Sequence, residues 1–214
     1  MVASVRARAV GLLVDLDGVL RVWDGSRAAA AEKRNGLPPG SLLGTAMSWP
    51  VRRPAISGEV SHAQWMAEVV RRLVAAGVDD VAAGAAVREW QEYRGEVSPE
   101  ALAFVREVRA AGRPVGLATN ATDLLDADLA ALGLAGEVDA VVNSSAVGHP
   151  KPAKAFFAAA CAALGLPPDR LLLVDDDDRA VRGARAAGLS AYRWTGPDDL
   201  RYVRAALDLR PAVD

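Results

Sequence analysis

The sequence predicts an α/β protein whose core is a doubly wound parallel sheet. Short aliphatic runs alternate with Ala- and Leu-rich helical patterns in the second half of the chain, and this alternation is typical of βαβ units. The aliphatic run at 10–16 indicates a strand buried on both faces, as strands of parallel sheets are. About 95 residues separate this strand from the next aliphatic run, far more than a crossover helix requires, which predicts an insertion.

The insertion at 21–97 has helical patterns and no convincing strand. Prolines and glycines interrupt it around 37–40, at Pro50 and Pro54, and at Gly77. Ser61 followed by Gln64 predicts a capping box at the start of one helix. The predicted helices cover 26–34, 40–48, 61–76 and 79–93. We therefore expect a small α-helical cap at 21–97, inserted into a core formed by 1–20 and 98–214.

The remaining elements return the chain to the core. Ser98 as N-cap and Pro99 at the first helical position predict a helix over 98–111. The further predicted strands are 114–118, 139–143, 170–174 and, more weakly, 189–193, and the further predicted helices are 122–132, 152–164, 179–187 and 198–207. Glycines stand just past several of these helical patterns, where a left-handed residue is favoured.

Composition restricts the function classes. The 214 residues are 51% hydrophobic and 24% charged, as in a globular protein, and the formal net charge is −2. This charge argues against a large nucleic-acid surface, because binding a phosphate backbone requires a basic excess. Cys161 is the single cysteine, so neither an intrachain disulfide nor a cysteine metal cluster is expected. Met1–Arg8 does not lead into a signal-peptide core, and no apolar stretch is long enough to span a membrane, so we expect a cytoplasmic protein.

Asp15 and Asp17 are the most informative pair of residues. They follow the first aliphatic run, and period-2 alternation places both on one side of an extended chain. Two like charges at the end of a buried strand are unfavourable unless a cation or a charged substrate compensates them. The pair therefore predicts a metal site.

The other strand ends supply complementary groups. In a doubly wound sheet, ligands bind at the carboxyl ends of the strands. Carboxylates suit Mg²⁺, which often bridges to substrate phosphate, and a hydroxyl with a lysine can hold phosphoryl oxygens. The groups at or after the later strand ends are Thr119, Asn120, Lys151, Asp175 and Asp176.

Taken singly, these motifs have simpler interpretations. Asp15-x-Asp17-Gly18 could be a turn, Thr119-Asn120 a helix cap, and Lys151 an exposed loop residue. The run Asp175 to Asp178 could be a helix start, and we expect Asp177, Asp178 or both to serve only there. Their joint occurrence in order, at successive strand ends, favours a functional site.

In this order the motifs resemble the haloacid dehalogenase-like (HAD) hydrolase superfamily, over nearly the whole chain. The resemblance implies a Rossmann-like core, and the segment 21–97 is similar in position and helical character to the α-helical cap of small sugar-phosphate phosphatases. It implies that Asp15 is the nucleophile that becomes an aspartyl phosphate, and that Asp17 is the general acid/base whose carbonyl also ligates the metal. It further implies that Thr119 and Lys151 contact the phosphoryl group, with Asn120 supporting Thr119.

For the metal, the resemblance implies that Asp176 is a direct Mg²⁺ ligand and Asp175 a second one. Dehalogenases of this superfamily need no acid two residues after the nucleophile and no Mg²⁺, so Asp17 points to phosphoryl chemistry. Two positions depart from the usual pattern: Ala153 replaces an Asp after Lys-Pro, and Ala180 replaces a polar residue.

The sequence thus predicts a Mg²⁺-dependent phosphatase that acts on a small phosphorylated metabolite. Two alternatives remain: a sugar phosphomutase, and a regulatory protein that binds phospho-ligands without turnover. Five cap residues could face the substrate: Trp23, Arg52, Arg53, His62 and Trp65. Of these, Trp65 is expected to pack the helices, and His62 is expected to be exposed or structural. Arg52 and Arg53 could steer an anion, although a solvated loop is the favoured interpretation.

Overall fold

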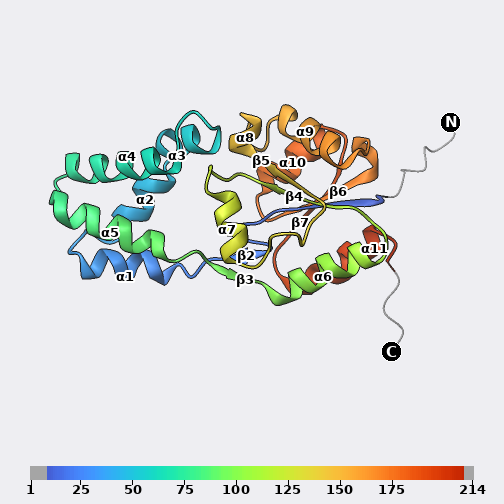
Figure 1. Ribbon diagram of the computed structural model, residues 1–214, viewed down its shortest axis with the longest axis horizontal. Helices are drawn as coiled ribbons and strands as arrows, with labels where there is room; N and C mark the ends of the chain where they lie inside the picture. Colours follow the sequence, from blue (N-terminus) through green and yellow to red (C-terminus); the bar gives the residue numbers. More distant parts are fainter. Residues whose placement is uncertain (1–8, 210–214) are drawn as a thin grey trace.

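The computed structural model describes residues 9–209, whose centre is a five-stranded parallel sheet (Figure 1). The strands are β1 (Gly11–Val14), β4 (Val115–Thr119), β5 (Ala140–Asn143), β6 (Leu171–Asp175) and β7 (Ser190–Arg193). Their order is β5-β4-β1-β6-β7, so the first strand is central and β4 and β6 flank it. The predicted Rossmann-like α/β core is confirmed, and each predicted core strand is present with slightly different ends.

Helices cover both faces of this sheet (Figure 1). They are α6 (Pro99–Ala110) and α11 (Leu200–Ala206) on one face, and α9 (Lys154–Leu164) and α10 (Asp178–Ala186) on the other. Because side chains alternate along a strand, β1 contributes to both layers. Leu12 and Val14 pack in the cluster that contains Val105 of α6, whereas Leu13 packs in the cluster that contains Phe157 of α9.

Shorter elements complete the core. They are α7 (Leu125–Ala131), α8 (Ser144–Val147), and the single 3₁₀ turns Pro168–Arg170 and Pro197–Asp199. The predicted helix at 98–111 is present, and the Ser98 hydroxyl accepts a hydrogen bond from the backbone N–H of Ala101.

The segment at residues 23–95 folds beside the sheet as a group of helices (Figure 1). These are α1 (Ser26–Arg34), α2 (Ser41–Met47), α3 (Trp49–Ile56), α4 (His62–Ala75) and α5 (Asp80–Glu92). They share a hydrophobic cluster of their own, which includes Leu42, Trp65 and Val69. The predicted capping box is present, with Ser61 and Gln64 exchanging hydrogen bonds at the start of α4.

Two features of this segment differ from the sequence prediction. Helix α3 contains both Pro50 and Pro54, which predicted breaks; Pro50 lies in the first helical turn, where its missing N–H is tolerated. The segment also enters and leaves through a two-stranded antiparallel ribbon of β2 (Arg21–Val22) and β3 (Glu96–Val97). Strands of two residues are too short to give a periodic signal.

The end of α3 touches the core directly. The Ser144 hydroxyl of α8 donates a hydrogen bond of 2.6 Å to the carbonyl of Ile56. Gly58 has φ +73°, and a side chain there would overlap the carbonyl of Ser145. Glycine therefore permits a close approach of this loop to α8.

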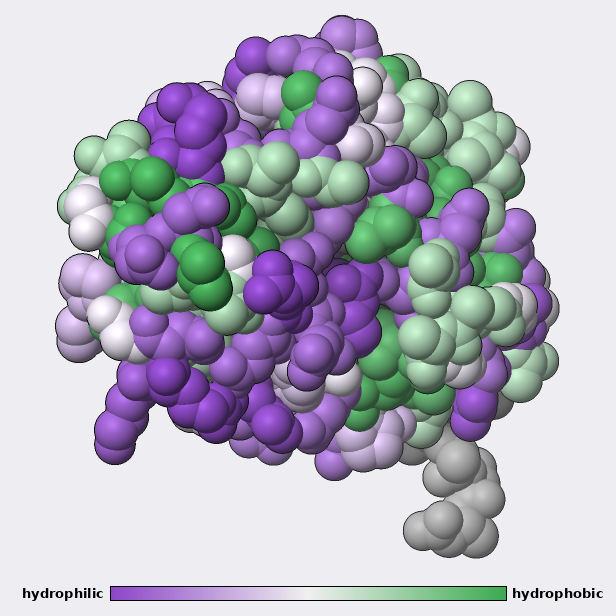
Figure 2. All heavy atoms as spheres, turned by 60° about the vertical axis from the view of Figure 1, so that its left-hand side comes forward, coloured by the Kyte–Doolittle hydropathy of each residue, from purple (hydrophilic) through white to green (hydrophobic). Residues whose placement is uncertain are grey.

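The surface carries hydrophobic residues in separate patches. Figure 2, with the side formed by α1–α5 brought forward, shows hydrophobic areas interrupted by hydrophilic residues. Trp49 and Val81 are among the exposed large hydrophobic residues of this segment. No helix within residues 9–209 is long and apolar enough to cross a membrane, and the segment Met1–Arg8 lies outside the described residues.

Candidate active site

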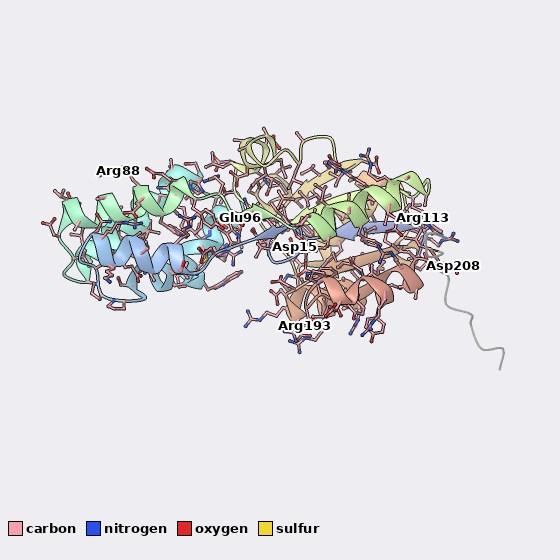
Figure 3. The ribbon with its side chains drawn as sticks, turned by 90° about the horizontal axis from the view of Figure 1, so that it is seen from below. Asp15, Arg88, Glu96, Arg113, Arg193 and Asp208 are labelled. Carbon is pink, nitrogen blue, oxygen red and sulfur yellow. The ribbon has the colours of Figure 1, made fainter. Side chains whose placement is uncertain are left out.

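The sheet brings all seven predicted site residues into one cavity. Asp15 directly follows β1, Thr119 ends β4 and Asp175 ends β6, and these three strands are neighbours. Figure 3 shows Asp15 where the helical segment meets the sheet. The cavity, here called the carboxylate cavity, has a volume of about 520 Å³. Its lining includes Asp15, Asp17, Thr119, Asn120, Lys151, Asp175 and Asp176.

Lys151 is the electrostatic centre of this cavity. Its ammonium is buried, 2.9 Å from a carboxylate oxygen of Asp15 and 2.6 Å from one of Asp175. It also donates a hydrogen bond of 2.9 Å to the carbonyl of Ala118. The interpretation of Lys151 as an exposed loop residue is therefore wrong, because the loop turns the side chain inward under two carboxylates.

Asn120 fixes the backbone of Lys151. Its side-chain oxygen accepts a hydrogen bond of 2.7 Å from the N–H of Lys151, and its amide nitrogen donates one of 3.1 Å to the carbonyl of the same residue. Thr119 and Asn120 do not cap the next helix, since α7 begins at Leu125. Asn120 thus positions the lysine that faces Asp15.

Burial and charge act against each other at Asp15. Burial raises the pKa of this carboxyl to about 7; Lys151 opposes the rise, and the nearby charge of Asp175 adds to it. Burial acts to lower the pKa of Lys151, but the charges of Asp15 and Asp175 outweigh it, so the pKa is raised. Lys151 is therefore a permanent cation shared between two carboxylates, and the site favours a further cation.

Three observations test whether a divalent cation and a phosphate fit this cavity. Carboxylate oxygens of Asp15, Asp175 and Asp176 all lie within 4.8 Å of one another. Gly18 has φ +80°, and a Cβ there would overlap the carboxylate of Asp176. Glycine at this position therefore leaves room for that carboxylate. The buried hydroxyl of Thr119 has no hydrogen-bond partner within residues 9–209. Carboxylate oxygens suit Mg²⁺, and an unpaired hydroxyl suits a phosphoryl oxygen.

The Asp17 carboxylate is held apart from these three carboxylates. One oxygen accepts hydrogen bonds of 2.7 Å from the Arg21 guanidinium and from the Trp23 indole N–H. The side chain of Asp17 is about one third exposed. It is thus oriented at the entrance of the cavity, where it can exchange protons with a ligand or with water.

The neighbouring acidic residues Asp177 and Asp178 lie at the start of α10, and Asp177 also lines the carboxylate cavity. Asp177 caps α10, because its carboxylate accepts a hydrogen bond from the N–H of Arg179. Asp178 forms an exposed ion pair with Arg182. Ala180, one of the two departures from the family pattern, is buried and lines the carboxylate cavity, where its methyl group supplies no hydrogen bond.

Three further residues contribute to this site. Arg21 was not predicted, Trp23 was predicted only as a cap residue that could face the substrate, and Arg52 was assigned to a solvated loop. Arg52 instead lies in α3 and lines the carboxylate cavity, whereas Arg53 points to Glu59, with an ion pair of 2.6 Å. The sequence does not indicate which of two adjacent arginines faces the cavity. Their different directions follow from the helical geometry of α3. Trp65 packs in the helical cluster, as predicted.

The chain with this site matches a family of known proteins. A family model described as haloacid dehalogenase-like hydrolase matches residues 11–188. The chain belongs to this family. The match includes every predicted site residue and confirms the resemblance seen in the sequence.

Curated relatives of the chain include several phosphatases. A phosphoserine phosphatase from Thermus thermophilus is 38% identical over 128 residues, which cover 58% of this chain and 49% of that protein. A haloacid dehalogenase-like hydrolase domain-containing protein 3 from Bos taurus is 31% identical, over 67% of this chain and 60% of that protein. A fructose-1-phosphate phosphatase from Escherichia coli is 36% identical over 37% of this chain and 43% of that protein. The matches thus span about half the length of these relatives.

Solved structures share the fold at low identity. A HAD family enzyme from Bacteroides thetaiotaomicron, solved with magnesium and inorganic phosphate, has a TM-score of 0.69 and 19% identity, covering 87% of this chain and 94% of that one. An L-2-haloacid dehalogenase from Xanthobacter autotrophicus has a TM-score of 0.65 and 21% identity. The match covers 95% of this chain and 85% of that one. Because phosphoryl-binding and dehalogenating proteins share this fold, the reaction must be argued from the residues.

Proposed function

We propose that the chain is a Mg²⁺-dependent phosphatase that hydrolyses the phosphate monoester of a small metabolite. One observation carries the proposal: the buried ammonium of Lys151, the unpaired hydroxyl of Thr119 and the three carboxylates of Asp15, Asp175 and Asp176 line one cavity. This set can hold an anion and a divalent cation side by side. The phosphatase names of several relatives support the same reaction class.

The reaction begins at Asp15. A carboxylate oxygen of Asp15 attacks phosphorus, the bond from phosphorus to the leaving oxygen breaks, and an aspartyl phosphate forms. Lys151 attracts the phosphoryl oxygens and Thr119 donates a hydrogen bond to one of them, so both stabilise the charge that moves onto these oxygens. Asp15, Asp175, Asp176 and the Asp17 carbonyl would hold a bound Mg²⁺, which would supply further neutralisation of the phosphoryl charge.

Asp17 handles the protons. It donates a proton to the leaving oxygen in the first step, and in the second it takes a proton from the water that attacks the aspartyl phosphate, which releases phosphate and restores Asp15. The hydrogen bonds from Arg21 and Trp23 to one carboxylate oxygen orient Asp17 and leave the other oxygen for this exchange.

We further propose that residues 21–97 act as a cap over the substrate. Their separate hydrophobic cluster and their connection through the β2–β3 ribbon support a unit distinct from the core. Trp23 and Arg52 of this segment line the carboxylate cavity. A cap in this position excludes bulk water from the reacting phosphoryl group.

Hydrolysis of p-nitrophenyl phosphate, with and without Mg²⁺, tests the proposal. We expect Mg²⁺-dependent release of phosphate that falls by about 10³-fold or more in Asp15→Asn, because loss of a nucleophile removes the covalent route. Asp17→Asn should lose turnover as well. Asp178→Asn, which alters an exposed acid in the same acidic run, is the matched control and should retain activity.

Three outcomes would contradict the proposal. Activity that survives in Asp15→Asn would exclude Asp15 as nucleophile, and activity that persists in EDTA would exclude the metal requirement. Absence of hydrolysis across a panel of phosphate monoesters, with the fold intact by circular dichroism, would favour a protein that only binds phospho-ligands.

A further inference from the structure

A second cavity opens directly beside the carboxylate cavity. Its volume is about 340 Å³, near the lower end of the roughly 300–1,000 Å³ of small-molecule sites. It lies between the helical segment and the core, with walls from α1 to α5 and from the start of α7. Asp17, Trp23, Arg52 and Asn120 line both cavities. A phosphate ester seated at Asp15 would therefore extend its organic part into this second space, here called the aromatic cavity.

Aromatic and aliphatic groups dominate the exposed wall. Trp23 and Tyr93 meet edge to face with ring centres 5.8 Å apart, and Trp65 and Trp90 do so at 6.4 Å. All four rings line the cavity. Aliphatic side chains complete the wall, and they are Leu43, Met47, Ile56 and Leu125. Faces and edges of rings in this arrangement accept another ring well.

The polar groups in the wall are already paired with one another. Asp128 accepts ion pairs from both Arg21 and Arg94. His62 contacts Gln91 through Nε2 at 3.0 Å and the Thr122 hydroxyl through Nδ1 at 3.3 Å. These pairs need no ligand to satisfy them, so the wall offers few unmet hydrogen-bonding groups.

Arg52 is the exception in this wall. It is half-buried at the boundary of the two cavities. Its backbone N–H donates a hydrogen bond to the carbonyl of Ser48, but its guanidinium forms no hydrogen bond or ion pair with any of residues 9–209. A guanidinium in this place complements an anionic phosphoryl group on one side and stacks on a planar group on the other. The boundary residue thus matches an ester that joins a phosphate to a ring.

We propose that the substrate is a phosphate monoester whose organic part carries an apolar ring, bound in the aromatic cavity while the phosphate lies at Asp15. This inference rests on the proposed phosphatase function and adds the substrate class to it. A sugar would fit worse: its hydroxyls would lie against rings and aliphatic side chains, and burying hydroxyls without partners is unfavourable.

The test compares primary alkyl phosphates, so that the leaving oxygen stays chemically similar. The substrates are 2-phenylethyl phosphate, ethyl phosphate and glucose 6-phosphate, assayed by phosphate release with Mg²⁺. We expect kcat/KM for the phenylethyl ester to exceed both others by about 10-fold or more, since burial of the ring removes apolar surface from water.

Cavity variants locate the source of the preference. Met47→Gln places a polar group in the wall at an exposed position, and Trp90→Leu removes a ring. Both should reduce the phenylethyl preference by about threefold or more, with little effect on ethyl phosphate. Trp49→Leu, an exposed tryptophan that is not part of the lining, is the matched control and should keep the preference.

The outcomes separate the two proposals. Equal rates for the three esters, or a preference for glucose 6-phosphate, would overturn the substrate class and leave the phosphatase function standing. A ring preference that is unchanged in folded Met47→Gln and Trp90→Leu would also overturn it. Failure to hydrolyse any ester, including p-nitrophenyl phosphate, would overturn the phosphatase function itself and the substrate class with it.

Discussion

At the scale of single residues, the site depends on a buried cation between acids. Lys151 offsets part of the charge of Asp15 and Asp175, but two carboxylates against one ammonium leave net negative charge in a desolvated place. The sequence predicted which residues meet here, because strand ends in a parallel sheet lie at one edge. It could not predict that Asn120 fixes the backbone of Lys151, since that pairing joins two loops.

Arg52 and Arg53 are adjacent in α3 but lie in different surroundings, since Arg52 lines the carboxylate cavity and Arg53 pairs with Glu59. We expect Arg52→Met to lower kcat/KM by about 10- to 100-fold, because a hydrogen bond to a charged group is worth roughly 1.5–3 kcal/mol. Arg53→Met should change it less than twofold, since Arg53 pairs with Glu59 on the surface. Steady-state kinetics and the inhibition constant of inorganic phosphate measure the difference. Equal effects of the two substitutions would show that Arg52 does not contact the substrate.

At the scale of elements, regular patterns were predictable and short or proline-rich elements were not. The long helices α4 and α5 have clear apolar faces and caps, and both were predicted. Helix α3 was missed because its two prolines resemble breaks, although tertiary contacts such as that from Ser144 to Ile56 hold it. Strands β2 and β3 each have two residues, so only the pairing of distant segments reveals them.

Asp128 of α7 connects elements that lie far apart in the chain. Its buried carboxylate forms ion pairs with Arg21 of β2 and with Arg94 of the loop after α5. We expect Asp128→Asn to lower the free energy of unfolding by about 2–4 kcal/mol, because the buried Arg21 loses one of its two carboxylate partners and Arg94 loses its only one among residues 9–209. Chemical denaturation with urea measures this value.

Glu68 provides the matched control for Asp128. It also accepts two arginines, Arg71 and Arg72, but on the exposed face of α4. Glu68→Gln should therefore cost about 1 kcal/mol or less, since solvent screens exposed ion pairs. A loss of similar size in both variants would mean that burial does not strengthen the Asp128 network.

At the scale of the whole molecule, the sheet with its covering helices and the helical segment α1–α5 have separate hydrophobic clusters. The two clusters on the sheet faces contain no buried residue of α1 to α5, and the third cluster contains only residues 31–87. The long insertion was readable from the sequence because its length exceeds a crossover. The contacts that join it to the core were not readable, because they depend on the β2–β3 ribbon and on the approach of the Gly58 loop to α8.

This division predicts that the core folds without its insertion. Val22 and Glu96 are paired across the β2–β3 ribbon, so an Asn-Gly turn can replace residues 23–95 and close a two-residue hairpin. We expect a cooperative thermal transition by circular dichroism and loss of the phenylethyl preference, because the aromatic cavity is gone. Mg²⁺-dependent hydrolysis of ethyl phosphate should persist at a reduced rate, because the excision also removes Trp23 and Arg52 from the carboxylate cavity.

Register supplies the control for this excision. Replacing residues 22–95 by the same turn pairs Arg21 with Glu96 instead of Val97, a slip of one residue that turns one of the two strands to the opposite face. Either Arg21 then loses its contacts with Asp17 and Asp128, or Val97 loses its packing against the hydrophobic cluster of the core. In both cases this shorter chain should melt at a lower temperature and hydrolyse ethyl phosphate more slowly than the in-register excision. If the in-register excision fails to fold, residues 21–97 are an integral part of the core rather than a cap. If it folds and still prefers the phenylethyl ester, the ring is recognised by the core.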